Sequence, residues 1–267
     1  MTKPLPLPSP FDFAQLDHLA RVAHRVLMLD YDGTLAPFRP QRMDAVPYPG
    51  VVEALRDLTA AQHTRVVIVS GRPLAELHVL LGTDLGIEMW GAHGWERLTA
   101  GGRFEQWQPS LDVAHVLNRA AESARAHVPA TAVEVKAASV AVHTRALTAA
   151  QRSDVDRMVD AHWVSPAGND AIELRVFDGG YELRAAGRTK GDVVTTLRDE
   201  ISDQRITSVL FAYLGDDDTD EDAFAALGAD DWPILVRSQP HPSRARFWLS
   251  PPADLLRFIH DWTIRRR

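Results

Sequence analysis

The chain has 267 residues, of which 45% are hydrophobic, a formal net charge of −7 and no cysteine. This size and composition predict a globular protein with one large domain, or one domain that carries a second, and the negative charge without a long basic run argues against a nucleic-acid partner. The lack of cysteine excludes disulfides, thiolate metal sites and cysteine nucleophiles, and it fits a cytoplasmic protein.

The first segment, MTKPLPLPSPFDF at residues 1–13, is rich in proline. It lacks the continuous apolar stretch of a secretory signal, so we expect an extended, partly mobile arm. No stretch of the sequence is long and apolar enough to span a bilayer, and we therefore expect no membrane partner.

A short apolar segment at residues 26–29 leads directly into two aspartates, Asp30 and Asp32 (VLMLDYDGT). Because the segment is apolar on both faces, it predicts a buried strand in a parallel sheet that helices cover on both sides. The two carboxylates then lie at the carboxyl end of the strand, where open α/β sheets bind their ligands. Two acids so close together predict acid–base chemistry, a metal site or both; a solvated turn is the alternative.

The next elements alternate between helix and strand. Residues 50–62 have the apolar spacing of a helix, and residues 65–73 (RVVIVSGRP) predict a second strand that ends in Ser-Gly-Arg-Pro. A short helix at residues 73–82, ending at Gly82, and a strand at residues 86–94 follow. A strand, a helix and a further strand in this order are typical of a parallel sheet.

The middle of the chain has a different pattern. Its predicted elements are a helix at 111–128, two strands within 131–147, a helix at 148–163 and a hairpin at 171–186 that turns at Asp178, Gly179 and Gly180. A helix followed by antiparallel strands, twice over, predicts an α+β domain at residues 109–186. Its size suits a cap that closes on a ligand.

Downstream of residue 186 the first pattern returns, with a helix at 190–201, a strand at 208–215 and a strand at 232–237. The strand at 208–215 runs directly into the acidic segment GDDDTDED. We therefore predict an α/β fold, in which a doubly wound, mostly parallel-sheet (Rossmann-like) core of residues 1–108 and 187–267 carries the α+β cap as an insertion.

Three of the predicted strands end in residues with useful chemistry, and the carboxyl ends of parallel strands meet at one edge of a sheet. These residues are Asp30 and Asp32, then Ser70 with Arg72, then Asp216, Asp217 and Asp220. A carboxylate can attack phosphorus, a second carboxylate can exchange protons with the leaving oxygen and with water, and Mg²⁺ prefers oxygen ligands.

Each of these groups also has a plainer interpretation. Ser70 and Lys190, each next to a predicted helix start, could bind phosphate oxygens, but either could be an ordinary surface residue. The acidic segment could be only a solvated helix start. A calcium-binding EF-hand is excluded for both acid clusters, because Glu221 and Gln41 stand where the loop needs glycine and glutamate.

At these residues the sequence resembles the haloacid dehalogenase superfamily, whose four motifs match DYDGT, VIVSGR, the lysine of TKG and GDDDTDED in that order. Within the superfamily it is similar to the trehalose-6-phosphate phosphatases, through LDYDGTLAPF, VSGRPLAEL, GAHGWE, VEVKAASVAVHTR and GDDDTDEDAF, from Val26 to Val236. The resemblance implies a Mg²⁺-dependent phosphatase that hydrolyses trehalose 6-phosphate in trehalose biosynthesis.

The resemblance also implies a role for each matching residue. Asp30 becomes the nucleophile that forms a phosphoaspartyl intermediate, and Asp32 the general acid and then the base. Ser70 and Lys190 hold the transferring phosphoryl group. The metal site comprises Asp30, the carbonyl of Asp32, Asp216, and Asp217 or Asp220 close by. The residues implied to contact the substrate are Arg72, His93, Glu134, Lys136, Arg145 and Glu182.

Glu134 and Lys136 also have a physical reason to act together, because positions i and i+2 of a strand face the same side; a surface ion pair is the alternative. The sequence departs from the family at Ala92, at Thr144 and at Arg184-Ala185, positions that bear on sugar recognition. Alternative functions are a phosphatase for sucrose 6-phosphate or a glycosyl phosphoglycerate, and a phosphoaspartate signalling receiver, although a receiver has no use for Asp32. A trehalose-phosphate synthase is the expected functional partner.

Overall fold

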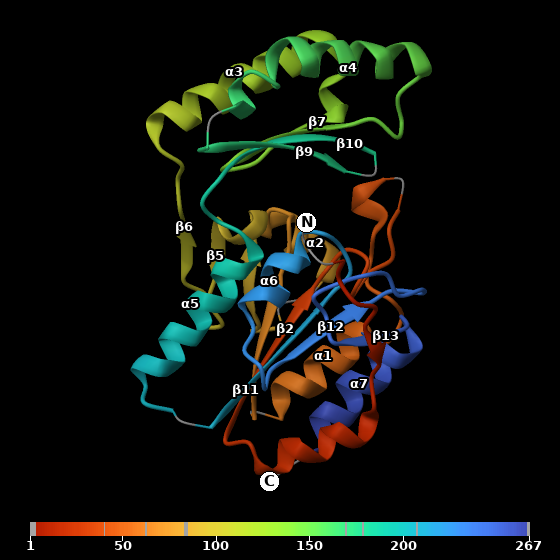
Figure 1. Ribbon diagram of the computed structural model, residues 1–267, viewed down its shortest axis with the longest axis vertical. Helices are drawn as coiled ribbons and strands as arrows, with labels where there is room; N and C mark the ends of the chain where they lie inside the picture. Colours follow the sequence, from red (N-terminus) through yellow and green to blue (C-terminus); the bar gives the residue numbers. More distant parts are fainter. Residues whose placement is uncertain are drawn as a thin grey trace. The chain divides into compact units, whose positions relative to one another are not determined.

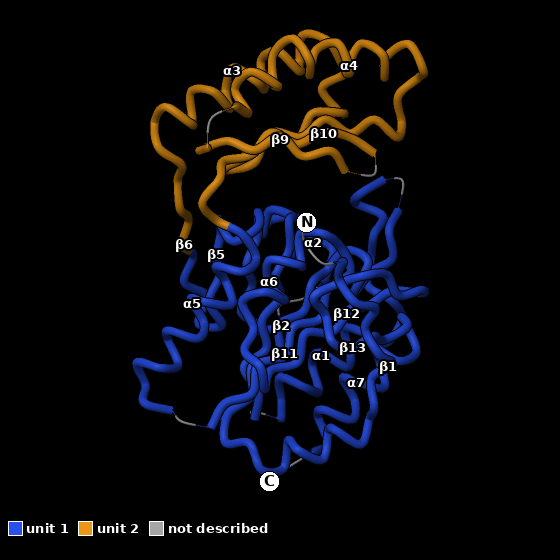
Figure 2. The backbone as a smooth tube through the Cα atoms, in the orientation of Figure 1, with its two compact units in different colours: residues 1–104, 189–267 blue, residues 105–188 orange. Residues whose placement is uncertain are grey.

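The computed structural model describes residues 4–39, 41–61, 63–82, 85–168, 170–177, 179–206 and 208–265. The chain divides into two compact units, which we call the first unit (residues 1–104 and 189–267) and the second unit (residues 105–188) (Figure 2). The predicted core and inserted domain change over at 108/109 and 186/187, a few residues from these limits.

The first unit is built on a large, mostly parallel sheet (Figure 1). Within the described residues the sheet has nine strands, in the order β1-β13-β12-β11-β2-β3-β4-β5-β6. The strands are β1 (Ser9–Pro10), β2 (His24–Asp30), β3 (Thr64–Val69), β4 (Glu88–Gly91), β5 (Glu96–Leu98), β6 (Phe104–Gln106), β11 (Val209–Gly215), β12 (Trp232–Val236) and β13 (Phe247–Leu249). In the sheet, every pair of neighbouring strands from β1 at one edge as far as β4 is parallel. Strand β5 then pairs antiparallel with β4.

Helices cover both faces of this sheet. They are α1 (Val51–Ala60), α2 (Leu74–Leu81), α5 (Lys190–Asp203), α6 (Asp220–Ala226) and α7 (Ala253–Ile264), with short 3₁₀ segments η1 (Phe13–Arg21), η2 (Arg42–Asp44) and η3 (Ala92–Gly94). In β2, Leu27 and Leu29 pack in the core cluster that holds α1 and α7, while the alternate residue Met28 is equally buried. The structure thus confirms the predicted doubly wound α/β class, and β2 is apolar throughout because neither of its faces meets water.

The described part of the N-terminal segment, predicted to be an extended, partly mobile arm, contacts the rest of the first unit. Pro6 accepts a hydrogen bond from the Ser243 N–H (3.0 Å), and β1 pairs with β13. Phe11 is buried edge-on against Phe258. An aromatic side chain in the core therefore anchors the part of the arm that the structure describes.

The second unit is a four-stranded antiparallel sheet with two long helices (Figure 1). Its elements are α3 (Leu111–His127), η4 (Ala130–Ala132), β7 (Val133–Val135), β8 (Ser139–His143), α4 (Ala149–His162), η5 (Pro166–Gly168), β9 (Ile172–Phe177) and β10 (Gly180–Ala185), with strand order β7-β8-β10-β9. The β9–β10 hairpin lies where the sequence predicts it, although Asp178 of its turn falls outside the described residues. Val140 pairs with Leu183 and both are fully buried, so the neighbouring residues Ala141 and Glu182 share the opposite face.

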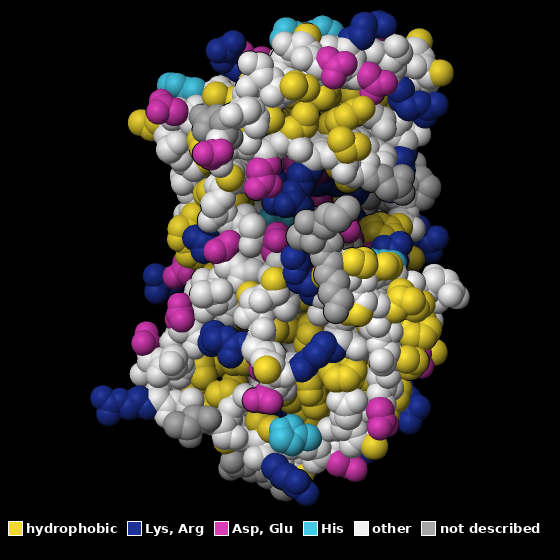
Figure 3. Space-filling model, in the orientation of Figure 1, with side chains coloured by type: hydrophobic (Ala, Val, Ile, Leu, Met, Phe, Trp, Pro, Cys, Tyr) yellow, Lys and Arg dark blue, Asp and Glu magenta, His cyan; other side chains and the backbone are white. Residues whose placement is uncertain are grey.

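The surface carries charges of both signs, interspersed over the face shown in Figure 3. None of the helices in the described part of the chain combines the length and the apolar composition needed to cross a bilayer.

Candidate active site

The ends of three adjacent strands of the first unit position the candidate site. In the sheet, β2 lies between β11 and β3. Asp30 is the last residue of β2, Ser70 follows β3 directly, and Asp216 follows β11. The strand order alone therefore brings the three predicted motifs to one edge of the sheet, with Asp30 in the centre.

Lys190 reaches the site from the first position of α5. The Thr189 side chain and the carboxylate of Asp192 form a capping box there, which fixes where the helix begins. Lys190 Nζ donates to Asp30 Oδ1 at 2.8 Å and to Asp220 Oδ1 at 2.7 Å. The lysine is only 3% exposed, so it supplies a desolvated positive charge shared by two carboxylates.

Asp220 has hydrogen-bond partners on both of its oxygens. Oδ1 accepts from Lys190 and from the Tyr213 hydroxyl at 2.7 Å, while Oδ2 accepts the backbone N–H groups of Asp216 (2.9 Å) and Asp217 (3.1 Å). Asp217 in turn accepts two hydrogen bonds from Thr219. Asp220 thus organises the loop after β11 and has little capacity left for another ligand.

The residues present fit a Mg²⁺ ion. One carboxylate oxygen each from Asp30, Asp216 and Asp220 lie within 4.8 Å of one another, and of these three Asp30 and Asp216 supply the oxygen ligands that Mg²⁺ prefers, with Asp220 behind them. Asp30 Oδ2 is buried and has no hydrogen-bond partner among the described residues. Gly33, at φ +82°, completes the cradle, because a Cβ there would stand 2.2 Å from Asp216 Oδ2.

Burial and mutual repulsion set the acidity of this cluster. Desolvation, joined by the charges of Asp220 and Asp217, raises the pKa of Asp30 well above its usual value despite the opposing charge of Lys190. The pKa of Asp216 is raised in the same way, by burial and by Asp30. For Asp217, burial is outweighed by Lys190 and by the Thr219 hydrogen bonds, which lower its pKa to about 2. A cation bound among Asp30 and Asp216 would relieve this unfavourable charge.

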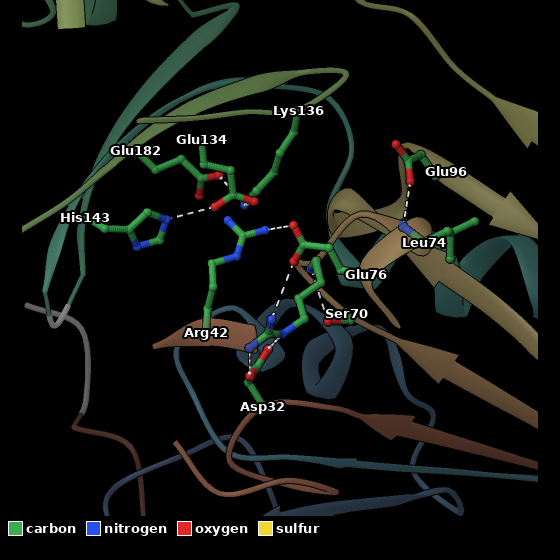
Figure 4. A network of polar contacts seen from close by, with 11 residues as sticks. Asp32, Arg42, Ser70, Leu74, Glu76, Glu96, Glu134, Lys136, His143 and Glu182 are labelled. Carbon is green, nitrogen blue, oxygen red and sulfur yellow. Dashed lines mark hydrogen bonds and ion pairs between the residues drawn. The ribbon is translucent and has the colours of Figure 1, made fainter. Parts of the chain in front are cut away.

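Asp32 is held by an arginine. Arg72 donates from Nε and Nη2 to the two oxygens of Asp32, each at 2.6 Å, and its backbone N–H donates to Ser70 Oγ at 3.1 Å (Figure 4). The side chain of Asp32 is 28% exposed, against 4% for Asp30. A paired, solvent-accessible carboxylate beside a buried one suits a group that exchanges protons with water and substrate.

His93 lies against the same segment. It has a left-handed backbone (φ 57°), its N–H donates to the Ser70 carbonyl at 3.0 Å, and a Cβ on Gly71 would come 2.6 Å from its ring. The backbone of Ala92 is also left-handed, and its N–H donates to the Arg72 carbonyl at 2.8 Å. Close packing of the imidazole on Gly71 therefore places His93 beside the Ser-Gly-Arg segment.

The predicted sugar-contacting residues of the second unit gather on one face of its sheet. Lys136 Nζ lies 3.0 Å from Glu182 Oε1 and 3.7 Å from Glu134 Oε1. Ser139 Oγ donates to Glu182 at 2.7 Å, and the His143 ring lies 2.9 Å from Glu134 Oε2 (Figure 4).

Arg145, also predicted to contact the substrate, follows β8 by two residues and is exposed. It packs beside Gly179, where a Cβ would stand 2.6 Å from its Nε. Arg145 therefore lies at the turn end of the β9–β10 hairpin.

Sequence reasoning missed several residues that shape these sites. Tyr213 lies on β11, three residues before Asp216, and its apolar sequence context predicts only a core residue. Ser139 and His143 lie on a predicted strand, and only the pairing of β8 with β7 and β10 brings them to the acidic residues. Glu76, which contacts Arg72, has no signal beyond its helical i, i+4 spacing from that arginine.

Comparisons with known proteins agree on one family. The trehalose-phosphatase family model matches residues 28–250. The trehalose-phosphate phosphatase of Mycobacterium marinum is 34% identical over 246 residues, which cover 89% of this chain and 61% of that protein. The bifunctional trehalose-6-phosphate synthase/phosphatase of Thermoproteus tenax is 34% identical over 235 residues, 85% of this chain and 30% of that protein. The chain thus spans about three fifths or less of the length of these relatives.

Solved structures share the fold. The C-terminal domain of the Candida albicans trehalose-6-phosphate phosphatase superposes with a TM-score of 0.79 at 20% identity, covering 97% of this chain and 98% of that domain. An Aspergillus fumigatus trehalose-6-phosphate phosphatase superposes with a TM-score of 0.66 at 25% identity, covering 96% of this chain and 99% of that one.

Proposed function

This chain belongs to the trehalose-phosphatase family, and we propose that it is a Mg²⁺-dependent phosphatase that hydrolyses trehalose 6-phosphate to trehalose and phosphate. The observation that carries the proposal is the contrast between two neighbouring acids: Asp30 is buried, bonded to Lys190 through one oxygen and unbonded at the other among the described residues, whereas Asp32 is paired with Arg72 and partly exposed. One is suited to attack, the other to move protons.

In the proposed reaction, a carboxylate oxygen of Asp30 attacks the phosphorus atom of the ester. A bond forms between this oxygen and phosphorus, the bond from phosphorus to the sugar oxygen breaks, and Asp32 gives that oxygen a proton. Asp32 then takes a proton from water as the water oxygen attacks phosphorus. The bond between Asp30 and phosphorus breaks, which releases phosphate, restores the Asp30 carboxylate and leaves Asp32 protonated for the next cycle.

The surrounding groups would hold the charge of the phosphoryl group. Lys190, which touches Asp30, and the Ser70 hydroxyl are proposed to bind its oxygens. Asp30, Asp216 and the carbonyl of Asp32 would hold Mg²⁺, with Asp217 and Asp220 close behind. When bound, the ion supplies positive charge that neutralises the carboxylates and polarises the phosphoryl group.

The second unit is proposed to be the cap that recognises the sugar. Glu134, Lys136 and Glu182 provide both acceptors and a cation within a few ångströms of one another on one sheet face, as hydroxyl groups require. Arg145 is proposed to assist there, and Arg72 and His93 at the phosphate. The bifunctional relative supports functional pairing with a trehalose-phosphate synthase, and we propose a cytoplasmic location for such an enzyme.

The test is phosphate release from trehalose 6-phosphate, sucrose 6-phosphate, a glucosyl phosphoglycerate and p-nitrophenyl phosphate, with Mg²⁺ and with excess chelator. We expect steady turnover with the highest kcat/KM on trehalose 6-phosphate, silenced by chelator and restored by Mg²⁺. Preference for another sugar phosphate would overturn the substrate alone. Phosphorylation of the protein in a single turnover, without continued phosphate release, would favour the receiver alternative. Full activity in excess chelator would show that the reaction does not need the metal.

A further inference from the structure

Four charged side chains of the first unit form a continuous row of contacts that begins at Asp32. While Nε and Nη2 of Arg72 hold Asp32, Nη1 of Arg72 lies 3.5 Å from Glu76 Oε2. The other oxygen of Glu76 accepts from Nη2 of Arg42. Figure 4 shows these contacts as one path from Arg42 through Glu76 to Asp32. Glu76 is thus bonded to two guanidinium groups, one of which holds the proposed acid–base residue.

The backbone that carries this row is fixed at both ends. Helix α2, which carries Glu76, has no cap from its own N-terminal residue; instead the buried carboxylate of Glu96 on β5 accepts the first N–H of the helix at 2.9 Å. On the other side, the Tyr31 hydroxyl, next to Asp32, donates to the Ala45 carbonyl at 2.8 Å and ties down the η2 turn that carries Arg42. The position of Glu76 is therefore set by the fold.

We infer that Glu76 is a positioning residue for the phosphoryl-transfer reaction. It holds one nitrogen of Arg72, so that the other two keep the Asp32 carboxylate in place to exchange protons with the leaving oxygen and with water. A bidentate arginine–carboxylate pair fixes the position of the carboxylate only when another group holds the guanidinium, because the arginine side chain has many rotamers. The inference rests on the proposed function, which supplies the role of Asp32.

Charge balance supports the same role. The row contains two cations and two anions in alternating order, and its inner members are largely buried, with the Arg72 side chain 9% exposed. Without the Glu76 charge, Nη1 of Arg72 would lose its contact with this carboxylate, and Arg72 could rotate away from its present geometry.

The leaving group of the substrate gives a test that a purely structural role would not pass. p-Nitrophenolate leaves phosphorus readily without a proton, whereas phenolate depends on a general acid, and neither substrate contains a sugar. The value of kcat/KM reports the steps up to the first phosphoryl transfer. The loss of kcat/KM caused by Glu76→Gln should therefore be at least about fivefold larger on phenyl phosphate than on p-nitrophenyl phosphate. Glu76→Asp, which keeps the charge but shortens the reach, should lie between the parent and Glu76→Gln.

Two further sets of variants keep the outcome interpretable. Glu53→Gln on α1, like Glu76→Gln, removes a carboxylate from the first turn of a helix, but Glu53 is exposed, so this variant should leave kcat/KM unchanged on both substrates. Arg42→Met should shift the two substrates in the same direction as Glu76→Gln, and the double variant should lose less than the product of the two single losses, because both act through one row of contacts.

Equal losses on both aryl phosphates, with a lowered melting temperature, would overturn the inference and leave Glu76 a structural residue of α2. The inference would also be overturned if folded Glu76→Gln and Glu76→Asp kept the parent's ratio of kcat/KM on phenyl phosphate to kcat/KM on p-nitrophenyl phosphate. Failure of the proposed function is distinguishable, since it would show in the parent protein as absent turnover of every phosphate ester, before any Glu76 variant is compared.

Discussion

Replacing Asp30, the proposed nucleophile, should stabilise the metal-free protein and, under the proposed mechanism, abolish its turnover. The first unit buries Asp30, Asp216 and Asp220, and Lys190 is a cation that touches two of them. Desolvation and carboxylate repulsion raise the pKa of Asp30 even after the attraction of Lys190 is included. Ionised Asp30 therefore destabilises the fold at neutral pH, and Asp30→Asn, which resembles the protonated acid in shape, removes that burden.

The direction of the effect follows from linkage between protonation and folding. Because folding raises the pKa of Asp30, its ionised form lowers the unfolding free energy at neutral pH. We expect a gain of about 1–2 kcal/mol for Asp30→Asn in chelator, of the size that point substitutions commonly produce. At about 2–4 °C per kcal/mol for a protein of this size, the melting temperature should rise by several degrees.

The assay is thermal unfolding followed by circular dichroism, in chelator and then in Mg²⁺. The matched control is Asp218→Asn, which removes the same charge from an exposed position of the same loop and should change stability by less than about 0.5 kcal/mol. Mg²⁺ should stabilise the parent more than Asp30→Asn, because the variant lacks one of the proposed metal ligands. The difference in melting temperature between the two proteins should therefore be smaller in Mg²⁺ than in chelator. If Asp30→Asn melts below the parent in chelator while Asp218→Asn does not, repulsion is not the dominant force in this cluster.

Two more predictions concern pH and the sugar. Because the folded-state pKa values of Asp30 and Asp216 are raised, these groups favour folding at low pH and lose that contribution as the pH rises through their folded-state pKa values. The melting temperature of the metal-free parent should therefore fall as the pH rises from the acidic range towards neutrality, and a flat profile or the opposite slope would contradict this. Asp217, with its pKa lowered to about 2, contributes the opposite slope only in more acidic solution. Glu134→Ala, Lys136→Ala and Glu182→Ala should each lower kcat/KM on trehalose 6-phosphate by several-fold to about a few hundredfold, with much smaller losses on p-nitrophenyl phosphate. Equal losses on the two substrates would assign these three residues to folding or closure.

Much of the first unit could be predicted because its chemistry is local in the sequence. A strand buried on both faces is continuously apolar, so residues 26–29 predict both β2 and the place where Asp30 stands. The capping box around Thr189 likewise marks the start of α5 and hence the position of Lys190. Such signals work because one short segment contains both the cause and its effect.

Contacts between distant segments escape prediction for the same reason. Arg72 is expected from the sequence to touch the substrate, but its contacts with Asp32 and Glu76, which come from different elements, are seen only in the structure. The burial of Phe11 depends on the C-terminal elements β13 and α7, which the sequence patterns do not predict, since it packs against Phe247 and Phe258. No periodicity in one segment reports a partner more than two hundred residues away.

The number of hydrogen bonds at each acid separates structural from reactive carboxylates better than burial does. Asp30 and Asp220 are both essentially inaccessible and both bonded to Lys190, so burial and charge cannot distinguish them. Asp220 accepts four hydrogen bonds across its two oxygens, including two from backbone N–H groups that hold the loop after β11. Asp30 keeps one buried oxygen without a partner among the described residues. A buried lone pair left unbonded is costly unless a ligand takes it, and this cost favours Asp30 as the group that meets metal and phosphorus.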